Sequence, residues 1–388
     1  MYRIALTVFY FLVFTLVSFK ISACYLGEVK FNNDFPGASS DKMLYSCEIN
    51  KKGNKIKFTL QPENTPINDS PWYAFQLSSK QSKSVKVVIA VKDGTNRYPP
   101  KISHDGIKWQ PIKYNNDGDL MSFRVKLGPK PLWIAGQEII TNEAYITWGD
   151  KLAQNASIEH KVIGHSVDKQ PIYVIESRQV FNAKPWLVVL GRQHPPEITG
   201  ALALFPFVST LLSDSELANV FRSRFNIAIV PNLNPDGVTA GYWRHNKNGV
   251  DLNRDWNKFK QPEVTAVDRY LSTLVEAGGV MSMAVDFHST KKDIFYTMPS
   301  DYGVEQPYLV NNWLNKLDAK RKDLEVIQKP GNNPDLGVFK QYFADKFKVH
   351  AITYEMGDNS DRTFIREVAI DAANSLMQTM LTDNNKLR

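Results

Sequence analysis

Apolar and polar positions follow two different patterns along the 388-residue chain, and the pattern changes near residue 150. Before that point, short β-rich runs, several of them alternating between apolar and polar residues, are separated by turn-rich pieces such as "PENTPINDSP". Several short strands with turn signals between them predict a small β-sandwich, for which we expect a packing or substrate-positioning role. The clearest predicted strands lie at 55–61, 72–79, 85–92 and 122–127.

After residue 150, apolar runs alternate with longer helical stretches. This alternation predicts an α/β domain with a mixed, largely parallel sheet that is flanked by helices. Ligands of such sheets bind outside the carboxyl ends of the strands, so the residues directly after each strand are the first candidates for a site. The predicted strands are 186–190, 225–230, 281–287 and 350–356, and the predicted helices are 201–212, 262–279, 307–320 and 363–381.

The N-terminus adds a third pattern, in which a basic start is followed by the apolar run 4–19 and by "KISAC". A basic segment, an apolar segment and a small residue, here Ala23, are typical of a secretory signal peptide. We therefore expect a signal peptide over 1–23, a β-sandwich domain over 24–150 and an α/β domain over 151–388. The alternative is an uncleaved membrane anchor, for which the run is only marginally long enough. After cleavage we expect no stable membrane insertion.

Composition and charge narrow the class of partner. Hydrophobic residues make up 43% of the chain and aromatic residues 12%, which is typical of a globular protein and argues against disorder. The 47 Lys and Arg residues exceed the 40 Asp and Glu residues, which gives a net charge of +7. This mild excess comes without a long basic block or a nucleic-acid motif, so we expect no nucleic-acid partner. The sequence gives no oligomeric state.

Cys24 and Cys47 are the only two cysteines of the chain. In an exported protein, such a pair near the mature N-terminus indicates one disulfide and a periplasmic or secreted location. The alternative is a lipid attached to Cys24, since "ISAC" also fits that signal. Lys20 is poorly placed for lipid attachment, and Cys47 would then be left unpaired, so we favour the disulfide.

Residues of metal-ligand type follow three of the predicted strands. His194 and Glu197 come after "WLVVLGRQ", His288 comes after "MAVDF", and Glu355 comes after "HAITY". Two histidines and a glutamate are a zinc ligand set that leaves a fourth position for water in a catalytic site. A further glutamate is then needed as the general base, and Glu355 is the candidate. A lone histidine after a strand is usually structural, but four such residues at strand ends favour a zinc site.

The stretch "NPDGVTAGYWRHNKNGVDLNRDW" over 234–256 occurs together with "HPPE", "DFHS" and "TYEMGD". In this order the motifs resemble the M14 family of zinc carboxypeptidases, and the resemblance covers most of 150–388. It is strongest to a bacterial exported branch related to the cytosolic carboxypeptidases, whose preceding β domain is similar to "PENTPINDSPWYAFQL" over 62–77. The resemblance implies that 151–388 is a catalytic domain with one Zn²⁺ per chain, which acts on peptide or protein C-termini.

The resemblance also implies a role for each matching residue of the centre. His194, Glu197 and His288 would bind zinc, and Glu355 would act as general base and proton shuttle. Asp251 would orient His194 from behind. The alternative for Asp251 is a carboxylate that caps a local turn.

Three further residues would contact the substrate. Asn253 and Arg254 would hold its terminal carboxylate, which a planar guanidinium grips with two hydrogen bonds. Arg244 would polarise the scissile carbonyl and stabilise the oxyanion. The alternatives are a surface pair of Arg254 with Asp255 and, for Arg244, a solvent-facing basic cluster.

Two residues near the end of the chain are weaker candidates. Counted back from Glu355, Lys340 falls where members of the family set specificity, and a cation there would favour Glu or Asp as the terminal residue. The alternative is a solvated lysine on a helix. Family members carry a mobile tyrosine that closes over the substrate, and Tyr342 is the candidate here. The alternative for Tyr342 is an aromatic side chain of the core.

Three other functions remain open at this point. Exported relatives trim cell-wall peptides, and distant relatives of the fold remove the acyl group from N-acyl amino acids with a similar zinc set. A non-catalytic peptide-binding protein is the alternative from another class. Such a protein would be expected to lack a ligand or the base, whereas all four positions are filled in this chain.

Overall fold

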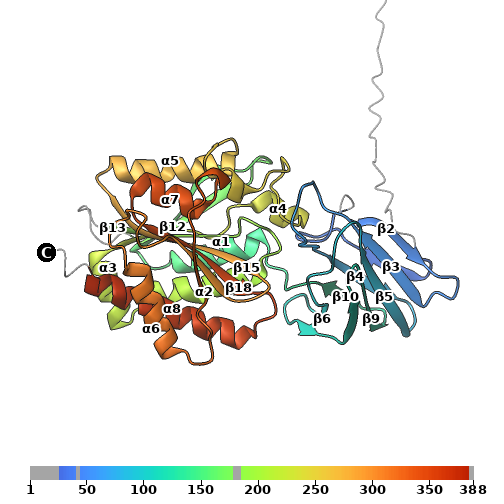
Figure 1. Cartoon of the computed structure of the whole chain (residues 1–388). Coiled ribbons are helices and arrows are strands. Elements are labelled where there is room, and N and C mark those ends of the chain that lie inside the picture. The colour runs from blue at the N-terminus through green and yellow to red at the C-terminus, as the bar shows by residue number, and fades with distance from the viewer. Residues whose placement is uncertain (1–25, 41–43, 178–184, 384–388) are drawn as a thin grey trace, which may run out of the picture.

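The structure is a computed structural model that describes residues 26–40, 44–177 and 185–383 (Figure 1). The expected signal peptide and Cys24 lie outside the described residues. Cys47 lies on strand β2 (Leu44–Ile49) and is not a free thiol. Because Cys24 is not described, the pairing of the two cysteines stays a prediction. In the described part of the chain, no single helix is long and apolar enough to cross a membrane. Only α2 (Ile198–Leu211) and α3 (Glu216–Arg224) together, bent by 85°, reach that length and composition.

The N-terminal part forms two five-stranded sheets that pack against each other, as the sequence predicts. Alternation places one side of each strand in the core: in β3, Ile56, Phe58 and Leu60 are buried. The rings of Phe58 and Phe75, one from each sheet, lie 4.4 Å apart between their centroids. One sheet has the order β1 (Val29–Asn32), β4 (Ala74–Ser79), β10 (Leu132–Ala135), β6 (Lys101–Ser103), β7 (Gln110–Pro111), and the other β2 (Leu44–Ile49), β3 (Lys55–Leu60), β5 (Lys83–Val91), β9 (Leu120–Leu127), β8 (Tyr114–Asp117).

The C-terminal part is built on one eight-stranded sheet, and its mixed, largely parallel character confirms the predicted fold class. The four central strands β14, β13, β15 and β18 run parallel, so their carboxyl ends meet at one edge. β12 and β16 join this group in antiparallel fashion. The strand order is β11 (Ile158–His165), β12 (Pro171–Ser177), β14 (Asn226–Val230), β13 (Pro185–Gly191), β15 (Val280–Thr290), β18 (His350–Gly357), β16 (Ile294–Thr297), β17 (Gln328–Pro330).

Helices cover both faces of this sheet (Figure 1). Because side chains alternate along a strand, Leu187 and Val189 of β13 face one helical layer while Val188 and Leu190 face the other. The central strands are therefore buried on both sides and read as continuous apolar runs in the sequence. One layer contains α2 (Ile198–Leu211), α3 (Glu216–Arg224), α6 (Leu309–Lys320) and α8 (Arg362–Asp383), and the other contains α5 (Pro262–Glu276) and α7 (Phe339–Phe347).

Two further helices lie near the junction of the two parts. α1 (Asn142–Leu152) spans the expected domain boundary at residue 150, and Nδ2 of Asn142 donates to the carbonyl of Pro235 at 2.9 Å. By this contact α1 packs with the α/β domain. α4 (Pro235–Ala240) is preceded by Asn234, whose side chain caps it by accepting a hydrogen bond from the N–H of Gly237. The loop that follows α4 reaches the β-sandwich, where Tyr242 and Trp243 join the buried core.

Candidate metal centre and cleft

The central strands bring the candidate residues to one edge of the sheet. His194 and Glu197 follow the end of β13, between this strand and α2. His288 lies on the neighbouring β15, and in the parallel register its partner on β18 is Glu355. Four residues from three distant parts of the sequence are thus neighbours because three parallel strands end side by side.

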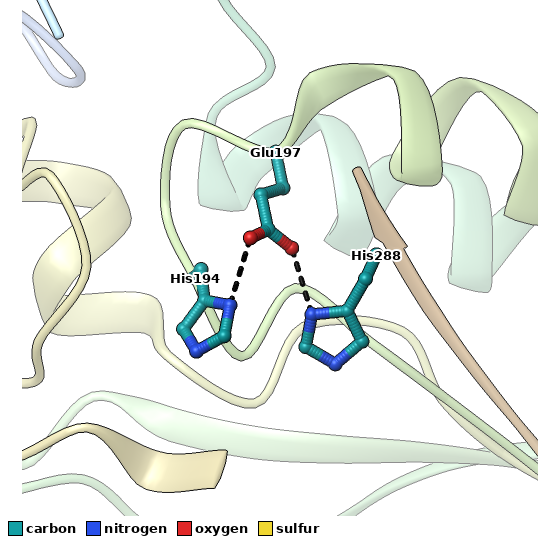
Figure 2. A group of neighbouring side chains, drawn as sticks. All are labelled: His194, Glu197 and His288. Carbon is teal, nitrogen blue, oxygen red and sulfur yellow. Dashed lines mark hydrogen bonds and ion pairs between the residues drawn. The ribbon is translucent and has the colours of Figure 1, made fainter. Parts of the chain in front are cut away.

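Three of these side chains converge on one point (Figure 2). The carboxylate of Glu197 lies between the two rings, with Oε1 2.8 Å from Nδ1 of His194 and Oε2 2.7 Å from Nδ1 of His288. All three side chains are buried, and their potential ligand atoms lie within 4.8 Å of one another. Both histidines therefore offer Nδ1 to the centre.

An aspartate holds the other nitrogen of each ring. Nε2 of His194 lies 2.9 Å from Asp251, and Nε2 of His288 lies 2.8 Å from Asp286. Such partners fix the tautomer and the orientation of a metal-binding imidazole. Asp251 also accepts a hydrogen bond from the N–H of Asn253, so it orients the ring and caps a turn at the same time.

Sequence reasoning missed Asp286. The signal was present in "DFH", because residues two positions apart on a strand point to the same face. Asp286 is fully buried, and its Oδ2 also accepts a hydrogen bond from Nε2 of Gln193 at 2.7 Å.

The charges around the centre suit a divalent cation. Burial alone would raise the pKa of Glu197, but the two imidazoles beside it outweigh burial and lower it well below its usual range. The pKa of His288 is raised against the effect of burial, because Asp286 and Glu197 flank the ring. The centre thus favours positive charge, and two nitrogens and a carboxylate are donors that zinc prefers.

Glu355 lies next to this donor set without joining it. Burial, together with the nearby charge of Glu197, raises the pKa of Glu355 to about 8. Its Oε2 is buried and has no hydrogen-bond partner among the described residues. The carboxyl group of Glu355 thus lies beside the centre, which is the position expected of a general base.

The centre opens into a cleft of about 550 Å³ that Arg244, Asn253, Arg254 and Lys340 also line. Arg244 is buried and its Nε donates to Asp251 at 2.7 Å, so a solvent-facing basic cluster is wrong for it. Oδ1 of Asn253 accepts a hydrogen bond from the N–H of Phe339, which ties this turn to the start of α7. Nη1 of Arg254 donates a hydrogen bond to the carbonyl of Asn253, and the alternative surface pair with Asp255 is not formed.

Lys340 is a cleft residue and not a solvated helix lysine. Its side chain is buried, and Nζ donates to the carbonyls of Gly331 at 2.6 Å and Thr297 at 3.2 Å. Burial lowers the pKa of Lys340 to about 8, against the opposing charge of Asp345. Two further side chains of the same wall, Lys329 and Tyr296, carry no recognisable signal in the sequence.

The prediction that Tyr342 closes over the substrate is wrong. Its hydroxyl donates to Asp268 at 2.7 Å, and its ring packs 5.0 Å from that of Trp256. The side chain belongs to the core beneath α7 and does not line the cleft of the metal centre. The reason is helical spacing: Lys340 and Tyr342 are two residues apart on α7 and therefore point in different directions.

The β-sandwich also contributes to the cleft, through Arg97 and Asn68. The guanidinium of Arg97 grips Asp358 with Nε at 2.7 Å and Nη2 at 3.0 Å, and Nη2 also donates to the carbonyl of Ser289 at 2.8 Å. Asp358 comes shortly after Glu355 in the sequence, and Ser289 comes directly after His288. Arg97 sits in a turn-rich loop of another domain, so no sequence pattern connects it to the site.

Helix α2 begins very close to β15. A Cβ atom at Gly200 would lie 2.5 Å from the carbonyl oxygen of His288. The N–H of Gly200 donates to Oγ of Ser289 at 2.8 Å. The absence of a side chain at this position therefore permits the close approach.

Comparisons with known proteins agree with this geometry. Residues 145–375 match the model of the zinc carboxypeptidase family. An uncharacterized protein of Zymomonas mobilis is 22% identical over 331 residues, which are 79% of this chain and 84% of that protein. Cytosolic carboxypeptidase 2 of Xenopus tropicalis is 33% identical over 170 residues, which are 43% of this chain but only 16% of that protein.

Among solved structures, a metallo-carboxypeptidase from Burkholderia cenocepacia has a TM-score of 0.76 at 18% identity and covers 93% of this chain and 100% of its own. A metallo-carboxypeptidase from Pseudomonas aeruginosa has a TM-score of 0.74 at 18% identity and covers 91% of this chain and 99% of its own. The likeness extends over both the β-sandwich and the α/β domain. At this identity it shows a shared fold.

Proposed function

Because this chain belongs to the zinc carboxypeptidase family, we propose that it releases the C-terminal residue of peptides and prefers glutamate or aspartate at that position. The chain is a metallocarboxypeptidase by its family. The preference for an acidic terminal residue is supported by one observation, which is the buried ammonium group of Lys340 in the wall of the cleft.

The centre supplies the chemistry of the cleavage step. His194, Glu197 and His288 would hold zinc, which supplies Lewis acidity that polarises a carbonyl and acidifies water. Glu355 accepts the proton of the attacking water and returns it to the leaving amine. Arg244 donates hydrogen bonds to the carbonyl oxygen as negative charge develops on it.

The rest of the cleft would bind the terminal residue. Asn253 and Arg254 hold the terminal carboxylate, for which the guanidinium of Arg254 has a matching fork of N–H groups. Lys340 would pair with the side-chain carboxylate of a terminal Glu or Asp. Burial disfavours the charged form of Lys340 although its Nζ donates to two carbonyls, so a carboxylate that enters the cleft would stabilise the ammonium group. Lys329 adds a second positive charge to the same wall.

The location of the activity is a further part of the proposal. The signal-like segment over 1–23 and the expected pair of Cys24 and Cys47 support export to a periplasmic or extracellular space. The substrates would then be exported peptides or the C-termini of proteins.

Release of the last residue from a matched set of peptides tests the proposal. The set has one sequence and ends in Glu, Asp, Leu or Lys, and kcat/KM is measured for the zinc-loaded protein. Faster release of Glu or Asp supports the acidic preference, whereas equal rates or a preference for Leu or Lys contradict it. Purified cell-wall peptides and an N-acyl amino acid complete the set; cleavage of these alone would replace the proposed substrate class.

A further inference from the structure

Glu63 belongs to the β-sandwich domain, yet its carboxylate is buried against a loop of the α/β domain. It lies between β3 and β4, and the residue is 5% exposed. The loop it contacts, 241–250, joins α4 to the turn that contains Asn253 and forms neither helix nor strand. A buried carboxylate needs several donors to offset its lost hydration, so its partners identify its role.

Three consecutive backbone N–H groups of that loop converge on this single carboxylate. Oε2 accepts from the N–H of Trp243 at 2.9 Å, and Oε1 accepts from the N–H groups of Arg244 at 2.9 Å and His245 at 2.8 Å. Nδ1 of His245 lies 3.0 Å from Oε1 as well. Successive N–H groups that point into one concavity form an anion-binding nest, and here a side chain of the other domain fills it.

The middle residue of the nest is Arg244. Nε of its side chain donates to Oδ2 of Asp251 at 2.7 Å, and Oδ1 of Asp251 lies 2.9 Å from Nε2 of His194. A continuous line of contacts therefore runs from Glu63 through the backbone of Arg244 to the metal centre. Any shift of this backbone would move the guanidinium in the cleft.

Neighbouring contacts hold the same loop from the same side. Nδ2 of Asn64 donates to the carbonyl of Gly249 at 2.7 Å. Tyr242 and Trp243 are buried in the core of the β-sandwich. The loop has no regular secondary structure, and these contacts with the other domain help to hold it in place.

From these contacts we propose that Glu63 is a positioning residue for Arg244, and that the β-sandwich thereby forms part of the catalytic apparatus. The proposal rests on the proposed function, which gives Arg244 its contact with the scissile carbonyl. If Glu63 acts in this way, its loss reduces turnover through Arg244 and leaves both zinc binding and the affinity for substrate in place. If Glu63 only joined the two domains, its loss would reduce stability, and its effect would be the same whether or not Arg244 is present.

A double-mutant cycle separates these two roles. The variants are Glu63→Gln, Arg244→Ala and the double variant, and kcat, KM and zinc content are measured for each. We expect Arg244→Ala to lower kcat by about 10²- to 10³-fold, as for the removal of an oxyanion donor, and Glu63→Gln to lower it by about 10- to 100-fold. The double variant should be no slower than Arg244→Ala, because the two changes remove the same interaction.

Glu138→Gln is the matched control. Glu138 also carries a largely buried carboxylate that joins distant parts of the chain, since it pairs with Arg362 at 2.8 Å. Among the described residues, both hydrogen bonds of this carboxylate come from Arg362 and none from the loop 241–250. Its variant should keep the kcat of the wild type. Glu63→Asp, which keeps the charge but shortens the side chain, should lose less activity than Glu63→Gln and covers the case in which Glu63→Gln does not fold.

Hydrogen exchange gives a readout that does not depend on activity. The amides of 243–245 should be protected in the wild type and should exchange faster in Glu63→Gln and Glu63→Asp. Multiplicative losses of kcat in the double variant, or unchanged exchange at 243–245, would overturn the proposal. If the wild-type protein releases no C-terminal residue from any peptide, the proposed function fails, and the exchange measurement alone then decides whether Glu63 holds the loop.

Discussion

Asp286 and His288 are separated by one residue on β15, and Oδ2 of the aspartate lies 2.8 Å from Nε2 of the histidine. The aspartate therefore determines that Nδ1 faces the metal centre. We predict that Asp286→Asn lowers the affinity for zinc by about 10- to 100-fold, because the ring loses its charged partner. Competition with a chelator of known affinity measures the change.

Asp251→Asn is the matched control for this prediction. Asp251 holds the other histidine but also accepts a hydrogen bond from Arg244, so its variant should lower both zinc affinity and the kcat of the zinc-loaded protein. Asp286→Asn should lower mainly zinc affinity. Unchanged zinc affinity in both variants would show that the aspartates do not support the ligands.

Glu355→Gln tests the assignment of the general base. The amide fills nearly the same space as the carboxyl group but cannot accept the proton of water. We expect zinc content to stay at the wild-type level while kcat falls by about 10²- to 10⁴-fold. Metal analysis and steady-state kinetics on one preparation check both statements. Wild-type turnover in this variant would require a different base.

Lys340 should make the preference for an acidic terminal residue depend on pH. Burial lowers the pKa of Lys340 to about 8, so the amine is charged below this pH and neutral above it. The ratio of kcat/KM for a peptide ending in Glu to that for one ending in Leu should therefore be high below pH 8 and fall as pH rises through it. Because kcat/KM reports the free protein, the midpoint should follow the pKa of unliganded Lys340.

Lys340→Met should remove this dependence and lower kcat/KM for the acidic peptide by about 30-fold or more, which is typical when a buried charge loses its partner. Lys346→Met is the control, because Lys346 lies on the same helix but pairs with Asp268 outside the cleft. It should behave like the wild type. A ratio that does not change with pH in the wild type would argue against a charged Lys340 as the specificity determinant.

The pair of Arg97 and Asp358 should contribute strongly to stability. Both side chains are almost fully buried, so removal of one leaves the other charge without its partner. We expect Arg97→Leu to lower the free energy of unfolding by about 3–5 kcal/mol. Denaturant titration of the purified protein measures this. Lys247→Met breaks the exposed pair with Asp168 and should cost less than about 1 kcal/mol; equal losses in both variants would contradict the prediction.

The sequence predicted the residues that follow strands better than those that depend on packing between distant segments. His194, His288 and Glu355 could be placed because buried parallel strands give long apolar runs and their carboxyl ends share one edge. Asp286 could have been found as well, because side chains two positions apart on a strand point to the same face. By contrast, the position of Tyr342 depends on which side of α7 faces the cleft, and no ungapped count can determine that.

The contribution of the β-sandwich could not be predicted from local patterns. Arg97 and Glu63 both lie in segments whose composition indicates turns and loops. Their importance comes from contacts with residues more than 150 positions away, which exist only after two domains have packed together. Loop residues of this kind carry no periodicity that would relate them to a site.

The close approach of α2 to β15 at Gly200 lies directly beside the metal centre. Glu197 stands at the start of that helix and His288 lies on that strand, so the gap between helix and strand is also the gap between two ligands. A methyl group at residue 200 would push the helix away from the strand and would increase the distance between the carboxylate of Glu197 and the ring of His288. The spacing of two ligands therefore depends in part on a residue that is itself no ligand.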